Sequence, residues 1–375
     1  MDTTTLRVDE PRELLAYLPH QLGFHPHESA VAVSLRAPRG RVGLVARVDL
    51  PDLADPQGGP QVARGLVAHL GADRAARTVL VLYTDADPRG PGLDPVGARA
   101  AATHFREGAA VPLGDVPVWV VTATGYLALD CEDVRCCPVG GRPLAELEST
   151  SVGAHMVLAG SCVARSRTGV GRVRTAPADA RRAVARVARR WQARQVLAEQ
   201  GGAAAQVAWR EQSLAAWRAA VRAVQDGAEP TRAAVLGRIE VGLTDRRVRD
   251  AVLVSMVPGT GDLAERSVRS DDPADMRAMG AAVGVIVDPQ SAQPPPPGPT
   301  AAHVQTLERV VAHGRRDAQA PALTLLAMLA WWQGDGVRAS ILVAQARAHD
   351  PAHRLACLLD DALAAALPPG WVRSG

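Results

Sequence analysis

Along the first 130 residues, short Val-rich apolar runs alternate with segments in which apolar residues recur at helical spacing. Residues 78–84, TVLVLYT, form a continuous apolar run of the kind found in a strand buried on both faces. The runs at 30–35 and 42–50 flank the turn-like segment Arg-Ala-Pro-Arg-Gly-Arg and predict an antiparallel β-hairpin. This alternation predicts an α/β fold with a mixed sheet. A further strand is predicted at 116–122, and helices at 62–70 and 95–107.

After about Leu144 the apolar positions keep helical spacing. In residues 178–200, for example, Val184, Val187 and Trp191 fall on one face of the predicted helix and arginines on another. Residues 290–299 include four consecutive prolines, which predict a stiff, extended linker. Helices are predicted at 178–200, 208–225, 231–240, 245–256, 273–287, 301–314, 321–334, 336–348 and 351–367.

These patterns predict the domain organisation of the 375-residue chain, which is long enough for two or three domains at about 100–200 residues each. We expect an α/β N-terminal domain with a mixed sheet, followed by all-α helical regions. The predicted segments are a mixed α/β domain at 1–145, a helical region at 146–288 with a basic segment at 165–194, a Pro-rich linker at 289–300, and a helical-hairpin region at 301–370.

The composition excludes several enzyme classes. The chain contains no lysine and no asparagine, so all 42 of its basic residues are arginines. Without lysine there is no Schiff base to pyridoxal phosphate, no P-loop or kinase lysine, and no Ser-x-x-Lys acyl-transfer centre. Without asparagine there is no glycosylation acceptor and no Cys-His-Asn protease triad. No dinucleotide-binding glycine motif follows a predicted strand, and the Gly-x-Ser-x-Gly elbow is absent.

Several features bear on location. The five cysteines are an odd and sparse set, unlike the disulfide framework of small secreted domains. The N-terminus lacks the basic region and apolar run of a signal peptide. The longest strongly apolar stretch, 323–332, is about half of the ~20 residues that span a bilayer. We therefore expect a cytoplasmic protein with no membrane span.

Motifs spread over the chain resemble those of the actinobacterial domain-of-unknown-function 4192 family. They include Glu13-Leu14-Leu15-Ala16, Leu22-Gly23-Phe24-His25-Pro26, Arg47-Val48-Asp49-Leu50-Pro51, Cys136-Cys137-Pro138, Arg142-Pro143-Leu144, Arg249-Asp250 and the stretch from Leu329-Ala330-Trp331 to Leu359-Asp360. The resemblance implies this order of segments and an origin in a GC-rich actinobacterium, and it implies no activity. The family pattern includes His25 but neither His20 nor His27, so the resemblance favours His25 as the candidate functional histidine.

The C-terminal residues are also similar to one tetratricopeptide-type helical hairpin, in which Gly334-Asp335 makes the turn and Ala339 and Ala346 occupy close-packing positions. That resemblance implies a surface for a protein partner or for self-association. About three repeats are normally needed for a stable solenoid, however, and the sequence offers only one convincing hairpin.

Three cysteines form the most unusual local motif, Cys131-x4-Cys136-Cys137. Three nearby thiolates are able to bind zinc, with Cys162 or His155 as a fourth ligand. A redox pair that joins Cys131 to Cys136 or Cys137 is an alternative, and so are buried thiols in a turn. The spacing is not that of paired Cys-x2–4-Cys knuckles, and the neighbouring acidic residues disfavour a reactive thiolate.

Two carboxylates, Asp85 and Asp87, follow the buried strand TVLVLYT. Ligands of α/β proteins bind at the carboxyl ends of strands, and carboxylates there are able to hold Mg²⁺. Asp49, at the end of another predicted strand, and His25 complete a candidate site for a metal-dependent hydrolase or transferase. The alternative is that Asp85-Ala86-Asp87-Pro88 is ordinary turn chemistry.

The net charge of +3 is small for a chain of this length, but the segment Arg165–Arg194 holds ten arginines and one acidic residue, Asp179. Arginines spaced along one helix face suit phosphate contacts with nucleic acid or contacts with an acidic partner. An anionic membrane surface and a solvated helix face are the alternatives. The arginines concerned are Arg182, Arg186, Arg189, Arg190 and Arg194.

No complete catalytic set is visible in the sequence. We therefore expect a non-catalytic binding or scaffold protein, with the metal-dependent enzyme and the nucleic-acid-associated protein as alternatives.

Overall fold

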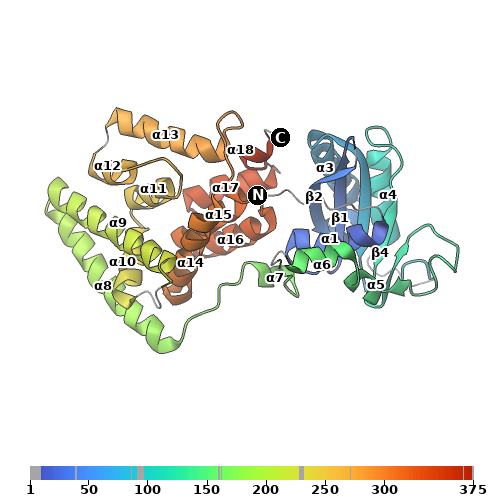
Figure 1. Cartoon of the computed structure of the whole chain (residues 1–375), viewed down its shortest axis with the longest axis horizontal. Helices are drawn as coiled ribbons and strands as arrows, with labels where there is room; N and C mark the ends of the chain where they lie inside the picture. Colours follow the sequence, from blue (N-terminus) through green and yellow to red (C-terminus); the bar gives the residue numbers. More distant parts are fainter. Residues whose placement is uncertain are drawn as a thin grey trace. The chain divides into compact units, whose positions relative to one another are not determined.

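The computed structural model describes residues 10–38, 40–85, 87–90, 97–158, 161, 163–227, 232–270, 272–365 and 367–373. The chain divides into two compact units, Met1–Val170 and Gly171–Gly375. The first unit is built on a mixed sheet, and the second is helical (Figure 1). The predicted fold class, an α/β part followed by helical regions, is therefore confirmed.

The sheet of the N-terminal unit has the strand order β2-β1-β3-β4-β5-β6. Its strands β3 and β4 pair in parallel, and the other neighbouring pairs are antiparallel. Parallel neighbours need a crossover connection, and helix α4 (Ala98–Ala109) lies between β3 and β4 in the chain. The strands span Ser29–Arg36 (β1), Arg41–Asp49 (β2), Ala75–Tyr83 (β3), Val118–Val121 (β4), Gly125–Ala128 (β5) and Arg142–Pro143 (β6).

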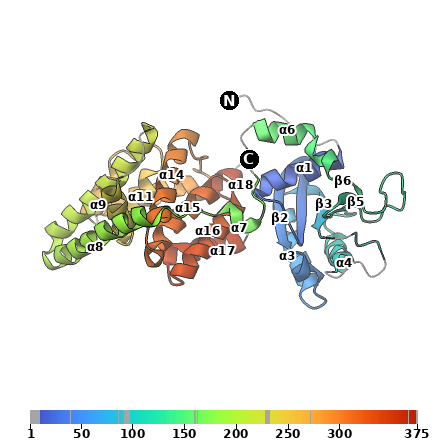
Figure 2. The ribbon, with the colours of Figure 1, turned by 90° about the horizontal axis from the view of Figure 1, so that it is seen from below.

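Helices cover both faces of this sheet. Ala30 and Leu80 point to the face that packs on α2 (Leu50–Ala54), α3 (Gly59–Ala72) and α4, since successive side chains of a strand alternate between faces. Figure 2 shows α1 (Pro11–Leu22) and α6 (Ser151–Leu158) on the opposite side from α3 and α4. The short helices α5 (Ala145–Glu148) and α7 (Arg167–Val170) complete the unit. Burial on both faces explains why TVLVLYT is apolar without alternation.

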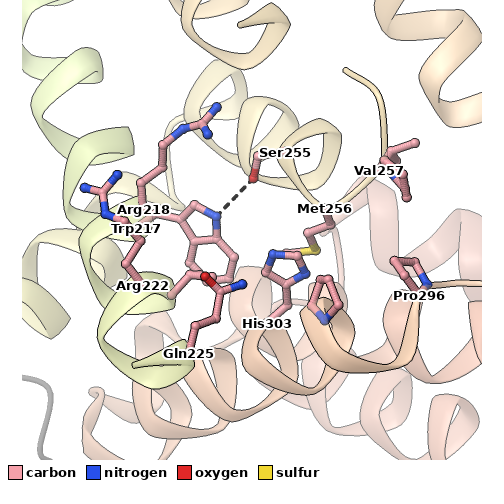
Figure 3. Close-up of a pocket in the computed structure, with 12 residues that line it drawn as sticks. Trp217, Arg218, Arg222, Gln225, Ser255, Met256, Val257, Pro296 and His303 are labelled. Atoms are coloured by element: carbon pink, nitrogen blue, oxygen red, sulfur yellow. Dashed lines mark hydrogen bonds between the residues drawn. The ribbon is translucent and has the colours of Figure 1, made fainter. Parts of the chain in front are cut away.

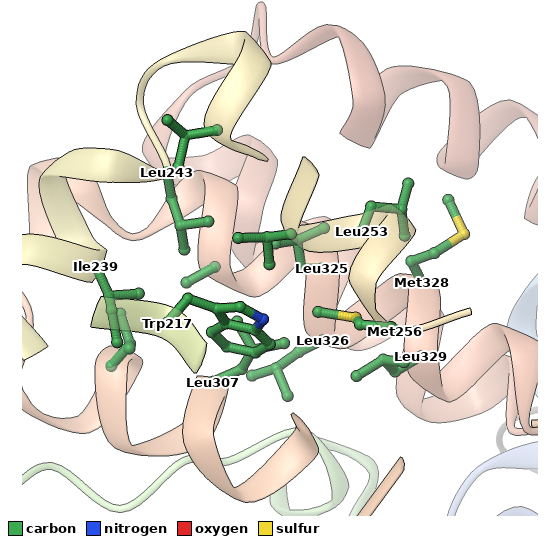
Figure 4. Close-up of a cluster of buried hydrophobic side chains, with 14 of the residues drawn as sticks. Trp217, Ile239, Leu243, Leu253, Met256, Leu307, Leu325, Leu326, Met328 and Leu329 are labelled. Atoms are coloured by element: carbon green, nitrogen blue, oxygen red, sulfur yellow. The ribbon is translucent and has the colours of Figure 1, made fainter. Parts of the chain in front are cut away.

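The helical unit is organised around α15 (Ala320–Trp332), in which every residue is buried. This helix contains the longest apolar stretch of the sequence. Figure 4 shows Trp217, Leu253, Leu307 and Leu325 meeting in this core from four different helices. The other helices are α8 (Ala178–Gln200), α9 (Ala203–Gln225), α10 (Ala233–Gly242), α11 (Arg246–Ser255), α12 (Leu263–Arg269), α13 (Pro273–Val287), α14 (Pro297–His313), α16 (Gly336–His349), α17 (Arg354–Ala364) and α18 (Gly370–Arg373), with a 3-10 turn at Arg316–Ala318.

Local signals account for several of these helix boundaries. The side chains of Asp245, Asp272 and Asp335 accept hydrogen bonds from backbone N–H groups in the first turns of α11, α13 and α16. Thr231, the expected cap before α10, lies outside the described residues. Residues 289–300, the expected Pro-rich linker, belong to the helical unit, and Pro297 begins α14.

The expected C-terminal hairpin corresponds to α15 and α16, which pack against each other. Gly334, with φ +87°, makes the turn between them in a backbone conformation that favours glycine. The similarity of this hairpin to tetratricopeptide repeats stays a prediction. Within the described parts of the chain, no helix is both long enough and apolar enough to cross a membrane.

Candidate functional site

A cavity of about 610 Å³ lies in the N-terminal unit where β3 and β4 end. Because these strands are parallel neighbours, their carboxyl ends meet at one edge of the sheet, which is where α/β proteins place ligands. The residues before β1 reach the same edge, since β1 runs antiparallel to β3 and pairs Ser29 with Tyr83. The lining residues come from α1, the loop before β1, the ends of β3 and β4 with the residues that follow them, and the segment from Leu144 to Val163. They are Leu15, Ala16, Pro19, His20, His25, Pro26, His27, Tyr83, Thr84, Asp85, Val121, Thr122, Ala123, Leu144, Leu147, Glu148, Gly153, Val157, Ser161 and Val163.

A polar cluster forms one rim of this cavity. His27 Nε2 lies 3.0 Å from Asp85 Oδ1, and both side chains are exposed. Glu28 Oε1 accepts hydrogen bonds from the Thr84 hydroxyl at 3.3 Å and from the Asp85 backbone N–H at 3.2 Å. Candidate ligand atoms of His27, Glu28 and Asp85 all lie within 4.8 Å of one another. Imidazole and carboxylate groups so arranged are able to hold a divalent cation.

Glu28 has two further unusual features. Its Oε2 is buried and has no hydrogen-bond partner among the residues that the structure describes. Its φ of +40° lies in the left-handed region, which non-glycine residues rarely adopt. Strained residues of this kind cluster at ligand-binding sites. Sequence reasoning missed Glu28 because its position beside Thr84 and Asp85 follows from the pairing of β1 with β3.

His25 and His20 lie on the wall of the same cavity. The backbone N–H of His25 donates to Ala164 O at 2.9 Å, which fixes the loop before β1 to the segment after α6. The ring of His20 is hydrogen-bonded through Nδ1 to the Ser161 hydroxyl at 3.1 Å. Burial, and secondarily the nearby His25, lower the pKa of His20. The neutral form of His20 is therefore favoured.

Of the four predicted sheet-edge residues, the structure brings His25 and Asp85 to the cavity but not Asp49 and Asp87. Asp49 accepts a hydrogen bond from Arg47 Nη2 at 2.5 Å at the end of β2. Asp87 is paired with Arg89, with Nη2 to Oδ2 at 2.8 Å, and this hydrogen-bonded guanidinium is the main cause of the lowered pKa of Asp87. Asp87 thereby holds Arg89 against the loop that carries the three cysteines.

The predicted cysteine cluster is brought together in space. Cys131, Cys136 and Cys137 lie in the loop between β5 and β6, with their sulfur atoms within 4.8 Å of one another. Of the remaining expected ligands, Cys162 lies outside the described residues. His155, which lies on α6, is not part of the cluster.

The five predicted arginines lie on α8 with exposed side chains. Val184, Ala188 and Trp191 form the buried face of the same helix. Arg194 covers the Trp191 ring at 5.6 Å, a cation–π contact. The others, Arg182, Arg186, Arg189 and Arg190, form no ion pair with any acidic residue in the described ranges. Their role in nucleic-acid or acidic-partner binding stays a prediction.

The helical unit has a cavity of its own, of about 520 Å³, between α9, α11 and the start of α14 (Figure 3). Trp217 and His303 stack there, with ring centroids 5.9 Å apart. Trp217 Nε1–H donates to the Ser255 hydroxyl at 3.0 Å. Burial lowers the pKa of His303 to about 4, and its Nδ1 has no hydrogen-bond partner among the described residues. His303 is therefore a neutral imidazole at neutral pH.

Fold and cavities together define a two-unit protein, with a sheet-edge cavity in its α/β unit and a second cavity in its helical unit. Residues 11–370 match the family model described as Domain of unknown function (DUF4192). The chain belongs to this family, as its N-terminal and cysteine motifs indicate. No curated protein and no solved structure matches the chain.

Proposed function

We propose that this chain is a non-catalytic binding protein whose N-terminal unit binds a small molecule in the sheet-edge cavity. The observation that carries this function is the cavity of about 610 Å³ at the carboxyl ends of β3 and β4. Its walls are mainly apolar, and its polar lining residues include His20, His25, His27 and Asp85. An apolar pocket with a small number of polar groups that fix orientation is typical of small-molecule sites. The expected ligand has an apolar body and one polar group that faces the histidines.

A cavity-filling variant tests this function. Ala123 is exposed two residues after β4 and lines the cavity, so Ala123→Trp should block the site at little cost in packing. Small molecules released from the purified full-length protein would be identified by mass spectrometry. We expect the wild type to release a bound molecule, and Ala123→Trp to retain about tenfold less of it, a loss of ~1.4 kcal/mol in binding.

The matched control is Val111→Trp, at a residue that is 96% exposed and does not line the cavity. It should retain the molecule as the wild type does. Release of nothing from the wild type, or equal release from both variants, would contradict small-molecule binding at this edge.

A metal-dependent hydrolase or transferase is the second candidate function. It is favoured by the convergence of His27, Glu28 and Asp85, which replace the carboxylate set that the sequence predicts. We expect the full-length protein to bind Mn²⁺, and Asp85→Asn to weaken that binding about tenfold or more because it removes a charged ligand. Titration followed by electron paramagnetic resonance measures the affinity. Asp49→Asn, an exposed carboxylate outside the cavity, is the control, and equal effects of the two variants would exclude this cation site.

The cytoplasm remains the proposed location, supported by the free state of Cys131, Cys136, Cys137 and Cys357. We also propose that the C-terminal helices bind a protein partner or a second copy of the chain.

A further inference from the structure

The loop between β5 and β6 gathers three thiols in a geometry that suits a metal ion. Cys136 Sγ and Cys137 Sγ are 3.9 Å apart, and Cys131 Sγ joins them within 4.8 Å. A zinc ion with Zn–S bonds of about 2.3 Å and tetrahedral angles places its sulfur ligands about 3.8 Å apart. None of the three cysteines forms a disulfide. The sulfur atoms are thus close to the separation that a shared zinc ion requires.

A network of hydrogen bonds fixes the backbone of this loop. Arg89 donates to three carbonyls, those of Cys131 at 3.0 Å, Cys137 at 3.2 Å and Pro138 at 2.9 Å. The backbone N–H groups of Cys136 and Cys137 both donate to Asp133 O, at 3.0 and 2.7 Å. Partners of this kind orient the ligands of a metal site and are part of its design.

Two donors compensate negative charge on the sulfur atoms. The Ala128 backbone N–H lies 3.4 Å from Cys137 Sγ and donates to it. The Arg89 guanidinium, bound to the carbonyls of Cys131 and Cys137, places a positive charge beside both residues. A bound dication adds to this compensation because it favours all three thiolates at once.

We propose that Cys131, Cys136 and Cys137 bind one zinc ion through three thiolates. Each thiol releases its proton to solvent as the Zn–S bond forms. No further His, Cys, Asp or Glu from the described ranges joins the cluster. Among the described residues the fourth coordination position has no protein ligand, and water or an atom of a ligand would complete the site there, as in sites that have three protein ligands. None of the three cysteines lines the sheet-edge cavity, so this site is independent of the proposed function.

Metal analysis of the full-length protein tests this site. The starting protein carries Cys357→Ser and keeps Cys162, which the sequence offers as a possible fourth ligand. After purification under reducing conditions, we expect one equivalent of zinc per chain by elemental analysis. Replacement with Co²⁺ should give the thiolate-to-cobalt charge-transfer absorption of a sulfur-rich site.

Cys136→Ser in this background is the decisive variant, since Cys136 is exposed and its replacement disturbs little packing. Competition with a chromophoric chelator should show zinc affinity weaker by about tenfold or more, with circular dichroism unchanged. Absence of zinc from the starting protein, unchanged affinity in Cys136→Ser, or a native disulfide between two of the three cysteines would overturn the assignment.

Discussion

Replacing Arg315 with alanine should lower the free energy of unfolding of the helical unit by about 3–5 kcal/mol. Arg315 Nε donates to Glu240 Oε1 at 2.8 Å, and the Arg315 backbone N–H donates to Oε2 at 3.3 Å. Glu240 is only 2% exposed, so the variant leaves a buried carboxylate without its cation. Removing one partner of a buried ion pair is costly because the other charge is then desolvated and uncompensated.

The loss of stability in Arg315→Ala should grow as the pH rises. Burial already raises the pKa of Glu240, and Arg315 is the partner that counteracts this effect. Without Arg315, the folded-state pKa lies further above the unfolded-state value. The folded state of the variant then binds a proton that the unfolded state has released, so stability falls as the pH rises through the folded-state pKa.

Urea unfolding followed by tryptophan fluorescence measures the effect, since every tryptophan except Trp119 lies in the helical unit. Arg316→Ala is the control. Arg316 is the exposed neighbour of Arg315, and it forms no ion pair within the part of the chain that the structure describes. It should change stability by less than about 0.5 kcal/mol. Equal midpoints for the two variants would show that the buried pair does not stabilise the fold.

Acidification from neutral pH to pH 4 should destabilise the helical unit through His303. This residue is 7% exposed and stacks on Trp217. Burial lowers its pKa from the ordinary 6.5 to about 4. Below pH 6.5 the unfolded chain therefore takes up a proton that the folded unit excludes. The stabilisation linked to the neutral His303 is fully present above pH 6.5 and is lost as the pH falls toward 4. At 1.36 kcal/mol per pKa unit, this loss of stability amounts to about 3 kcal/mol.

His303→Leu removes this titration and keeps an apolar side chain against Trp217 (Figure 3). Carboxylates also titrate over this range, so the measured quantity is the difference between wild type and variant in stability at pH 7 and at pH 4.5, from urea unfolding. We expect the variant to lose less stability than the wild type. His349→Leu, at an exposed histidine of α16, should behave as the wild type does. Identical pH profiles for wild type and His303→Leu would contradict a buried, neutral His303.

The helical boundaries show how far local information reaches. The helix predicted at 178–200 coincides with α8, because the periodicity of its apolar face is a property of consecutive residues. Helix α1 and strand β5 were not predicted. In α1, Pro19 interrupts an otherwise helical pattern. The four residues of β5 have too few side chains to show a period, and the strand exists through its pairing with β4.

The candidate sites show where local information ends. The position of Asp85 after a buried strand indicates the cavity, because that rule depends only on strand direction. Asp87 lies two residues further along the chain and looks equivalent in sequence. In the structure, however, it forms an ion pair with Arg89 and does not line the cavity. Glu28 reaches the site through the β1–β3 register, which no short segment contains.

By itself, the sequence determined most of the strands and helices in their order, the buried run of β3, the apolar stretch that becomes α15, and the absence of all chemistry that needs lysine. These properties follow from composition and from periodicity within single segments. Only the tertiary structure decided which carboxylates share a cavity, which of them arginines neutralise, and how closely the three thiols of one loop approach each other. The physical reason is that strand register fixes which segments meet at the cavity, and that loop packing fixes where the side chains of a single loop point.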